Sequence, residues 1–359
     1  MFFLLLALVA FMYMVELRSL DNSLQGLSCQ HDLSQVLAAP QEVIATITSL
    51  TNHSRRFLPY IRLVEYLPGE TVVHADSLQL TKDLQGGWQH SATVYLMPRS
   101  KLERRLQISL PRRGHYLFRG LQLGGGDFLG LSEVRQQVES FNEVIIYPPE
   151  STREYLPDTL GGFVGDISLR RFILEDPVLT VGFREYSGRE PLKSISWQQS
   201  ARLDKLMVKQ YDYTTEPSLT VVLSVAHQGE KEEAAPLLEE CYALCHTVCR
   251  LLEEKGIKYD FVSNMVTAGA WGSWSYIPEG LGAHHFTTIL EGLGRATYQC
   301  GESFTTMLRR VLANPGERGL VIITPDPTIS QERLLSERHP SSYLILSAED
   351  PDKPSSPGA

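Results

Sequence analysis

The hydrophobic residues of this 359-residue chain follow one pattern before about residue 150 and another after about residue 215. In the first part, short runs rich in β-branched and aromatic residues are broken by Pro, Gly and Asn turns, which is typical of an antiparallel β-sandwich. In the second part, apolar runs are separated by amphipathic stretches, which is typical of a Rossmann-like parallel sheet with flanking helices. We therefore predict a multidomain protein that combines β and α/β folds.

The predicted sandwich occupies residues 18–150, and the α/β domain occupies residues 215–348. The sandwich strands are expected at 41–52, 56–68, 88–98, 101–111 and 115–131, and "FNEVIIYPPE" closes the series. The α/β strands are "SLTVVLSV", "IKYDFVSNMV", "GLVIIT" and "YLILS". The longest helix has Pro236 in its first turn and stops at Gly256, and shorter helices are expected near 284–297, 302–313 and 328–338.

The two ends and the middle of the chain follow neither pattern. Residues 2–15, "FFLLLALVAFMYMV", are continuously apolar but span about 20 Å as a helix, less than the ~30 Å hydrocarbon core of a bilayer. We predict a membrane segment at 1–17, with a signal peptide or an amphipathic or core segment as alternatives. Residues 151–214 form a connecting segment, and the acidic, proline-rich tail 349–359 should be disordered.

Composition excludes some classes of function. The net charge is −9 and no basic stripe is visible, which argues against nucleic-acid binding. The stretch "GGGDFLG" lacks the G-K-[ST] of a phosphate-binding loop, so no ATP hydrolysis is expected. Three of the five cysteines lie within one predicted helix, which favours a reducing compartment over a disulfide framework.

Two stretches resemble a bacterial family. The first follows the pattern G-x-R-E-Y … I-x-W-x-x-[ST]-A-R, and the second follows R-R-G-x-Y … D-x-x-G-L. The matching residues of the first are Gly182, Arg184, Glu185, Tyr186, Ile195, Trp197, Ser200, Ala201 and Arg202. Those of the second are Arg112, Arg113, Gly114, Tyr116, Asp127, Gly130 and Leu131. These motifs are similar to those of the membrane-anchored proteins known as domain of unknown function 58.

The resemblance implies a von Willebrand factor A-like α/β domain, a location at the bacterial inner membrane with cytoplasmic soluble domains, and a MoxR-type AAA+ ATPase as partner. This chain departs from the family pattern where "RE" replaces G-D, where Lys193 replaces an Arg and where Ser196 replaces an Asp. An Arg-to-Lys change loses a planar bidentate donor, so a carboxylate partner would be held less specifically.

The first motif, residues 182–212, admits two roles. Arg184, Glu185, Arg202 and Lys209 are the right residues for an ion-pair network joining the two domains, with Tyr186 and Trp197 as apolar anchors. Exposed Trp, Tyr and Arg would instead form a docking surface for a partner. No nucleophile with a base beside it supports a catalytic role.

The von Willebrand factor A-like resemblance implies a metal site that begins D-x-S-x-S after the first strand. In "SVAHQ" the three positions are Ser224, Ala226 and Gln228, and Asp326 stands where a later Asp is expected. Hard cations usually need at least one carboxylate. We predict a degenerate site without metal or cofactor, unless Glu230 or Glu232 reaches in.

A group of cysteines and an aromatic stretch each admit more than one interpretation. Cys241, Cys245 and Cys249 recur every four residues, and small buried residues against the sheet are favoured over a redox pair, because one zinc ion cannot reach all three. The stretch 271–286, "WGSWSYIPEGLGAHHF", is expected to be a loop that packs its aromatic residues on the sheet or contacts a partner.

The sequence thus predicts a non-enzymatic, membrane-anchored interaction or adaptor protein for complex assembly or envelope maturation. One alternative is a metal-dependent adhesion module. The other is a hydrolase with Cys249 or Ser224 as nucleophile, paired with His227 or His246, and with Glu230 or Glu240 as orienting acid.

Overall fold

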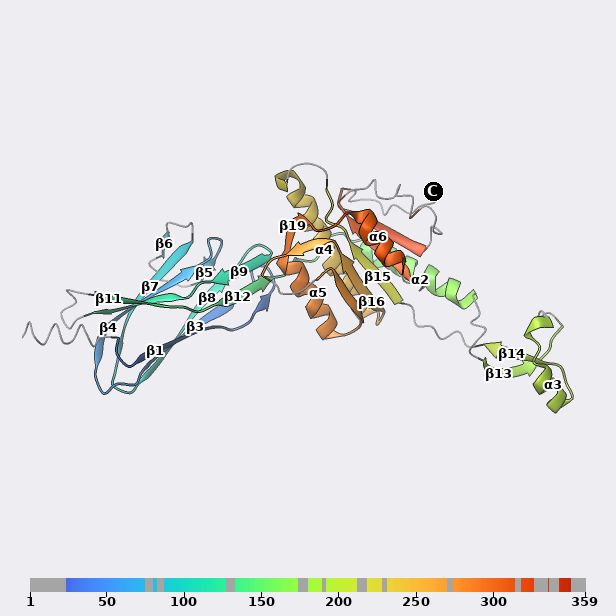
Figure 1. Ribbon diagram of the computed structural model, residues 1–359, viewed down its shortest axis with the longest axis horizontal. Coiled ribbons are helices and arrows are strands. Elements are labelled where there is room, and N and C mark those ends of the chain that lie inside the picture. The colour runs from blue at the N-terminus through green and yellow to red at the C-terminus, as the bar shows by residue number, and fades with distance from the viewer. Residues whose placement is uncertain are drawn as a thin grey trace, which may run out of the picture. The chain divides into compact units, whose positions relative to one another are not determined.

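The computed structural model divides the chain into two compact units (Figure 1). It describes residues 24–74, 80–82, 87–126, 133–173, 180–188, 192–211, 218–227, 231–269, 274–313, 318–325, 335 and 342–349. The first unit comprises the described residues of Met1–Pro149, Thr267–Trp271 and Leu290–Ala296. The second comprises those of Glu150–Val266, Gly272–Ile289 and Thr297–Ala359. The chain is therefore β-rich and multidomain, as the sequence indicates.

The first unit is built mainly from antiparallel strands in three sheets. One sheet has the order β1-β3-β8-β5, a second β11-β10-β4-β7-β6, and a small third β2-β12-β9, in which β2 and β12 are parallel. The strands are β1 Leu27–Leu33, β2 Leu37–Ala38, β3 Ile44–Asn52, β4 Leu58–Leu67, β5 Val72–Val73, β6 Leu80–Lys82, β7 Trp88–Leu96, β8 Lys101–Ser109, β9 Gly114–Phe118, β10 Leu121–Gly126, β11 Glu133–Val138 and β12 Asn142–Ile146.

The two larger sheets of this unit share a core. Strand β3 alternates buried and half-buried residues along its whole length, as the period of two requires when one face is covered. Its Leu50 packs with Ile61 and Leu63 of β4 and with Leu121 and Leu123 of β10. The sequence places β3, β4, β7 and β8 within a few residues of their observed bounds but misses β1 and β11, and it merges β9 with β10.

The second unit holds a five-stranded sheet of order β18-β16-β15-β20-β21. Its strands are β15 Ser218–Leu223, β16 Lys258–Ser263, β18 Tyr276–Gly280, β20 Gly319–Thr324 and β21 Tyr343–Ser347. Four of them run parallel, but β18 pairs antiparallel with β16. The sheet is therefore mixed rather than wholly parallel.

The antiparallel strand corrects a second expectation. Residues 276–280 form β18 and residue 283 already begins a helix, so the stretch 271–286 is not one long loop. The polar and proline-containing sequence "YIPEG" conceals the strand, because an edge strand tolerates proline and needs little apolar alternation. The remaining paired strands are β17 Met265–Thr267 with β19 Ala296–Cys300 and β13 Thr180–Glu185 with β14 Met207–Tyr211.

The α-helices are α2 Leu156–Ile173, α3 Trp197–Leu203, α4 Lys231–Glu254, α5 Ala283–Arg295 and α6 Phe304–Leu312, and η1 Leu192–Ser194 is a short 3-10 turn. Helix α2 lies in the segment expected to be a connector. Helix α4 ends at Glu254, just before the predicted stop at Gly256, which has φ of 68°, a conformation that glycine adopts without a Cβ clash. Among the described residues, no helix is long and apolar enough to cross a membrane. The predicted membrane segment 1–17 lies outside the described residues. So do the predicted helix near 328–338, except residue 335, and the tail 349–359, except residue 349.

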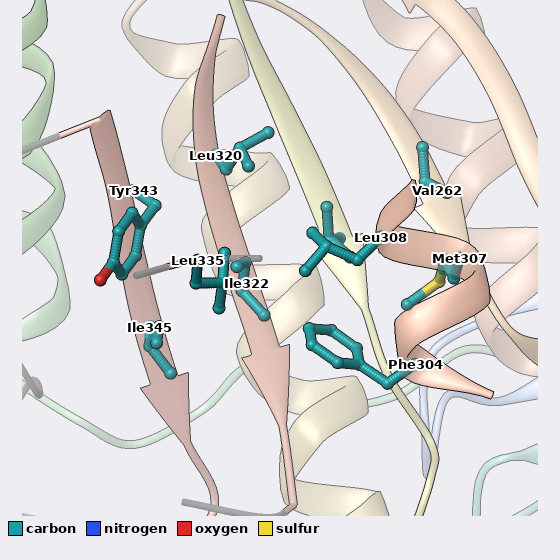
Figure 2. Close-up of a cluster of buried hydrophobic side chains, with 10 residues drawn as sticks. Val262, Phe304, Met307, Leu308, Leu320, Ile322, Leu335, Tyr343 and Ile345 are labelled. Carbon is teal, nitrogen blue, oxygen red and sulfur yellow. The ribbon is translucent and has the colours of Figure 1, made fainter. Parts of the chain in front are cut away.

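One face of the mixed sheet packs against α6 (Figure 2). Phe304, Met307 and Leu308 of that helix meet Ile322 of β20 and Ile345 of β21, all almost fully buried. Every residue of β20 and β21 is buried, so both strands have neighbours on both faces. This is why the sequences "GLVIIT" and "YLILS" are continuously apolar and were assigned to strands with the correct bounds.

Candidate functional site

The first family-like motif folds into a small module, which we call the signature module and define as the described residues of 180–211. It consists of the β13–β14 hairpin, η1 and α3. Ser200 holds the helix to the hairpin, because its Oγ donates to the carbonyl of Ser196 at 2.8 Å and accepts the N–H of Met207 at 2.8 Å. Ile195 and Val208 form a β-bridge and are buried. The Ser at this position of the motif therefore has a structural role.

The charged residues of the module lie at its surface. Glu185 pairs with Lys205 at 2.6 Å, and both side chains are about two-thirds exposed, so this pair contributes little stability. Arg184, Arg202 and Lys209 are also exposed. Lys205, which the sequence analysis passed over, is thus the partner of Glu185. Gly182 and Tyr186 are half-buried, and the N–H of Tyr186 donates to the carbonyl of Leu206.

Large apolar side chains are exposed on the signature module. Trp197 is 66% exposed, so it is not the apolar anchor that the sequence suggested. The others are Phe183, Leu192, Leu203 and Leu206. Exposed tryptophan with neighbouring leucines and arginines is the composition of a protein-binding surface, because such side chains gain most when a partner removes them from water. The signature module thus exposes five large apolar side chains.

The second family-like motif lies in the first unit and is also structural. Arg113 donates through Nη1 to the carbonyls of Leu293 and Ala296, both at 2.7 Å, and so satisfies acceptors at the C-terminal end of α5. Tyr116 donates to the carbonyl of Arg112 at 3.0 Å. Burial and the nearby Glu70 carboxylate raise the pKa of Tyr116, which keeps its hydroxyl protonated. Asp127, Gly130 and Leu131 lie outside the described residues.

The carboxyl ends of the parallel strands are where a cation site is expected. Buried hydroxyl residues lie at these ends: Ser224 directly follows β15, and Ser263, Thr324 and Ser347 are the last residues of β16, β20 and β21. Ser224 is fully buried, and its Oγ accepts the N–H of Ala226 at 3.4 Å. Gln228 and Asp326 lie outside the described residues, and so do Glu230 and the side chain of Glu232.

Asn264, which the sequence did not single out, hydrogen-bonds two segments at this edge of the sheet. Its Oδ1 accepts the N–H of Val225 at 2.8 Å, and its Nδ2 donates to the carbonyl of Glu302 at 3.1 Å. Asn264 is 2% exposed, so its amide joins the end of β15 to the segment before α6 in a buried environment. A polar residue directly after the apolar strand "YDFVS" is the signal that points to it.

An arginine occupies the same edge at β21. Arg153 donates to the carbonyls of Ser347 at 2.8 Å and Ala348 at 3.0 Å, and pairs with Glu240 at 2.9 Å. Its side chain is 8% exposed. Within the described ranges, no group of three or more His, Cys, Asp or Glu side chains is arranged to hold a metal ion.

The nucleophiles considered for a hydrolase are inaccessible. Ser224 and Cys249 are fully buried, as are Cys241 and Cys245. Burial raises the pKa of Cys241 and of Cys245, so their reactive thiolates are disfavoured. The Nδ1 of His227 lies 3.0 Å from the carbonyl of Val225, and the ring of His246 packs on Phe286. The cysteines therefore pack as small apolar residues of α4, as the favoured interpretation holds.

Comparisons with known proteins add little. No family model matches the chain, and no curated protein matches it. One similar solved structure is AvmM, which catalyses macrocyclization in alchivemycin A biosynthesis, with 12% identity, 35% of this chain, 92% of that chain and a TM-score of 0.24. Another is a cohesin module from a Clostridium perfringens family 33 glycoside hydrolase, with 15% identity, 33% of this chain, 96% of that chain and a TM-score of 0.24. A type II cohesin domain from the Acetivibrio cellulolyticus cellulosome has 12% identity, 33% and 91% coverage, and a TM-score of 0.21. At such TM-scores these likenesses support no conclusion about fold or function.

Proposed function

We propose that this protein is a non-enzymatic, membrane-anchored interaction protein that works with a MoxR-type AAA+ ATPase in complex assembly or envelope maturation. The observation that carries the proposal is the signature module, which exposes Trp197 and four other large apolar side chains. A module of this size gains nothing in its own stability from exposed tryptophan and leucine, whereas a docking surface gains binding energy from them. The ATPase as partner comes from the family-like motifs.

The α/β part is proposed to be von Willebrand factor A-like. Four parallel strands with helices packed against them support this assignment. The antiparallel edge strand β18 does not oppose it, because doubly wound sheets often carry one antiparallel edge strand.

The cation site of that fold is proposed to be degenerate. A buried Ser224 bonded within its own loop is a poor ligand, and the same edge of the sheet is occupied by Arg153, which pairs with Glu240. Mg²⁺ requires oxygen ligands with enough negative charge to offset its dehydration. The proposal therefore excludes cation-mediated adhesion as the mode of binding.

The soluble parts are proposed to lie in the cytoplasm beside the inner membrane of a bacterium, held by residues 1–17. The five cysteines are free thiols, which supports a reducing compartment. The Cys300 side chain is exposed and would be open to oxidation outside such a compartment.

The test is isothermal titration calorimetry of the full chain in detergent, with the MoxR-type ATPase of the same organism as titrant and with Mg²⁺ and Mn²⁺ in separate runs. We expect binding of the ATPase and no heat from either cation. Trp197→Ala should weaken the ATPase complex about tenfold or more, since tryptophan at an interface centre typically contributes at least 1–2 kcal/mol. Phe141→Ala is the matched control, because Phe141 is 85% exposed on the other unit.

Absence of ATPase binding, or equal loss in both variants, would contradict the docking role of the signature module. Binding of Mg²⁺ tighter than about millimolar would instead favour a metal-dependent adhesion module.

A further inference from the structure

Two turns lie together at one end of the sandwich, between β3 and β4 and between β7 and β8. The buried Asn52 joins them, because its Nδ2 donates to the carbonyls of Arg56 at 2.8 Å and Met97 at 3.0 Å. The N–H of Arg99 also donates to the carbonyl of Ser54 at 3.1 Å. We call residues 53–57 and 95–101 the sandwich tip.

The sandwich tip exposes large apolar side chains. Phe57, Tyr95 and Met97 are 44%, 63% and 55% exposed, and the two rings lie 6.3 Å apart between centroids. Nothing in the backbone requires apolar residues at these exposed positions, since the turns are held by the Asn52 amide and by main-chain hydrogen bonds. Their clustering indicates a contact surface.

The same tip is cationic. Its exposed charged residues are Arg55, Arg56, Arg99 and Lys101, and "HSRRF" and "YLMPRSK" contain no acid. Within the described part of the chain, none of the four is in an ion pair. The nearest acid along β8, Glu103, pairs with Arg105 at 2.9 Å. In a chain of net charge −9, this surface is suited to an anionic partner.

The chain enters the sandwich at this tip. The N–H of His53 donates to the carbonyl of Gly26 at 2.8 Å, and Leu24, the first described residue, packs against the adjoining core. The apolar run 2–15 precedes Leu24 by eight residues, which reach at most about 30 Å when fully extended. A bilayer that holds residues 2–15 therefore keeps the tip close to its surface.

We propose that the sandwich tip lies on an anionic membrane surface. Phe57, Tyr95 and Met97 enter the headgroup region, where aromatic side chains are enriched, and the four cations face lipid phosphates. The inference rests on the proposed membrane segment at 1–17. A short apolar segment together with a basic patch supplies two attachment signals, which fixes the sandwich on the bilayer instead of leaving it on a free tether.

The experiment places an environment-sensitive fluorophore on the full chain at Met97→Cys or, as control, at Phe141→Cys, both in a Cys300→Ser background. Burial raises the pKa of Cys29 to about 11, so this thiol reacts slowly at neutral pH. The protein is reconstituted in vesicles of phosphatidylcholine alone or mixed with phosphatidylglycerol. We expect a blue shift at position 97 that requires phosphatidylglycerol and is reversed by high salt, and no shift at position 141.

Charge variants sharpen the result. Arg55→Gln with Arg56→Gln should lower the ratio of docked to undocked protein about 30-fold, because each basic residue near an anionic surface strengthens attachment about fivefold. The matched control, Arg105→Gln with Arg135→Gln, removes the same net charge from exposed positions on β8 and β11 and should leave the ratio unchanged.

Flotation separates this inference from the anchoring on which it rests. If the chain floats with both kinds of vesicle but position 97 never responds, anchoring stands and the docked tip is wrong. If the chain floats with neither and position 97 is silent, both are wrong. A response at position 97 to the ATPase, but not to vesicles, would make the tip a protein-binding surface and overturn the inference.

Discussion

The space between the two large sandwich sheets and the cluster between the mixed sheet and α6 differ in whether they contain charged side chains. Between the two large sheets of the sandwich, Glu65 is 2% exposed and accepts hydrogen bonds from Thr48 at 2.6 Å, His90 at 3.1 Å and Arg104 at 3.2 Å. The cluster between the mixed sheet and α6 consists of hydrophobic residues alone, and its largest polar group is the hydroxyl of Tyr343 (Figure 2). The region around Glu65 therefore depends on matched charges, whereas the cluster beside α6 depends on packing. Buried charge in the second unit lies elsewhere, as in Asp260 of β16, which is 3% exposed and pairs with Arg318 at 3.3 Å.

The electrostatics of the sandwich core follow from its geometry. Burial raises the pKa of the Glu65 carboxyl, but hydrogen bonds from His90 and Thr48 and the charge of Arg104 outweigh burial, so its pKa is lowered overall. Burial also lowers the pKa of His31, whose Nδ1 lies 3.1 Å from the Thr48 hydroxyl. Both shifts favour an ionised Glu65 and a neutral His31 at neutral pH.

The largest effect is expected for Glu65→Ala, which removes the anion and leaves His90 and Arg104 unmatched. Breaking a buried charge pair from one side typically costs about 3–5 kcal/mol of unfolding free energy. Hydrogen exchange measured by mass spectrometry on peptides from β4 and β8 should report this loss, while peptides from β20 and β21 stay protected. Loss of less than about 1 kcal/mol would mean that packing alone holds the sandwich.

Ile322→Ala tests the apolar core in the same way. Ile322 is fully buried against α6, and truncating such a residue costs about 2–5 kcal/mol. The increase in exchange should appear in β20, β21 and α6 and should be equal at neutral and mildly acidic pH, because no charge is altered. A penalty that changes with pH would contradict a purely apolar origin.

The pH dependence of the sandwich is the next expected effect. Because the pKa of His31 is lower in the folded chain, His31 stabilises the fold at pH values above its unfolded pKa of 6.5. This stabilisation is lost as the pH falls below 6.5. Because the pKa of Glu65 is also lower in the folded chain, Glu65 stabilises the fold at pH values above its unfolded pKa of 4.5. This stabilisation is lost as the pH falls through the folded-state pKa of Glu65. A tenfold difference in a group's acid dissociation constant between the folded and unfolded chain corresponds to about 1.4 kcal/mol of unfolding free energy.

Calorimetry of the full chain between neutral pH and about pH 2 should therefore show the sandwich transition losing stability in two steps. Glu65→Gln should abolish the lower step, and His31→Gln should abolish the upper one. An unchanged lower step in Glu65→Gln would show that another group is responsible.

The smallest effect is expected for Glu103→Ala, which removes an acid from the surface of the same unit. Glu103 pairs with Arg105, but both side chains are well exposed, and such pairs contribute about 0–1 kcal/mol. Exchange of β8 should change little. A loss comparable to that of Glu65→Ala would mean that burial does not explain the difference between the two sites.

Local sequence patterns predicted much of the fold. "GLVIIT" and "YLILS" have the correct bounds because strands buried on both faces are continuously apolar, and α4 stops at Gly256 because glycine adopts a positive φ. Helix α2 was missed because its sequence, "LPDTLGGFVGDISLRRFI", contains three glycines and lacks a clear apolar stripe. Strand β18 was missed because its apolar content is low.

The candidate sites depended more on the tertiary structure. The family-like motifs directed attention to residues 182–202. They did not distinguish Ser200, whose hydrogen bonds join α3 to β14, from Trp197, which is exposed. Whether a side chain is exposed depends on how the folded chain packs. The sequence alone therefore does not tell a tryptophan buried in a core from one exposed for contact with a partner.

The sequence by itself determined the two periodicities, the division between β and α/β parts and the apolar N-terminal run, because each depends on residues that are close together in the chain. Only the tertiary structure decided that Arg113 meets carbonyls about 180 residues away and that Glu65 finds Thr48, His90 and Arg104 on three other strands. The physical reason is that a buried charge is tolerated only where distant partners converge on it, and convergence is a product of folding.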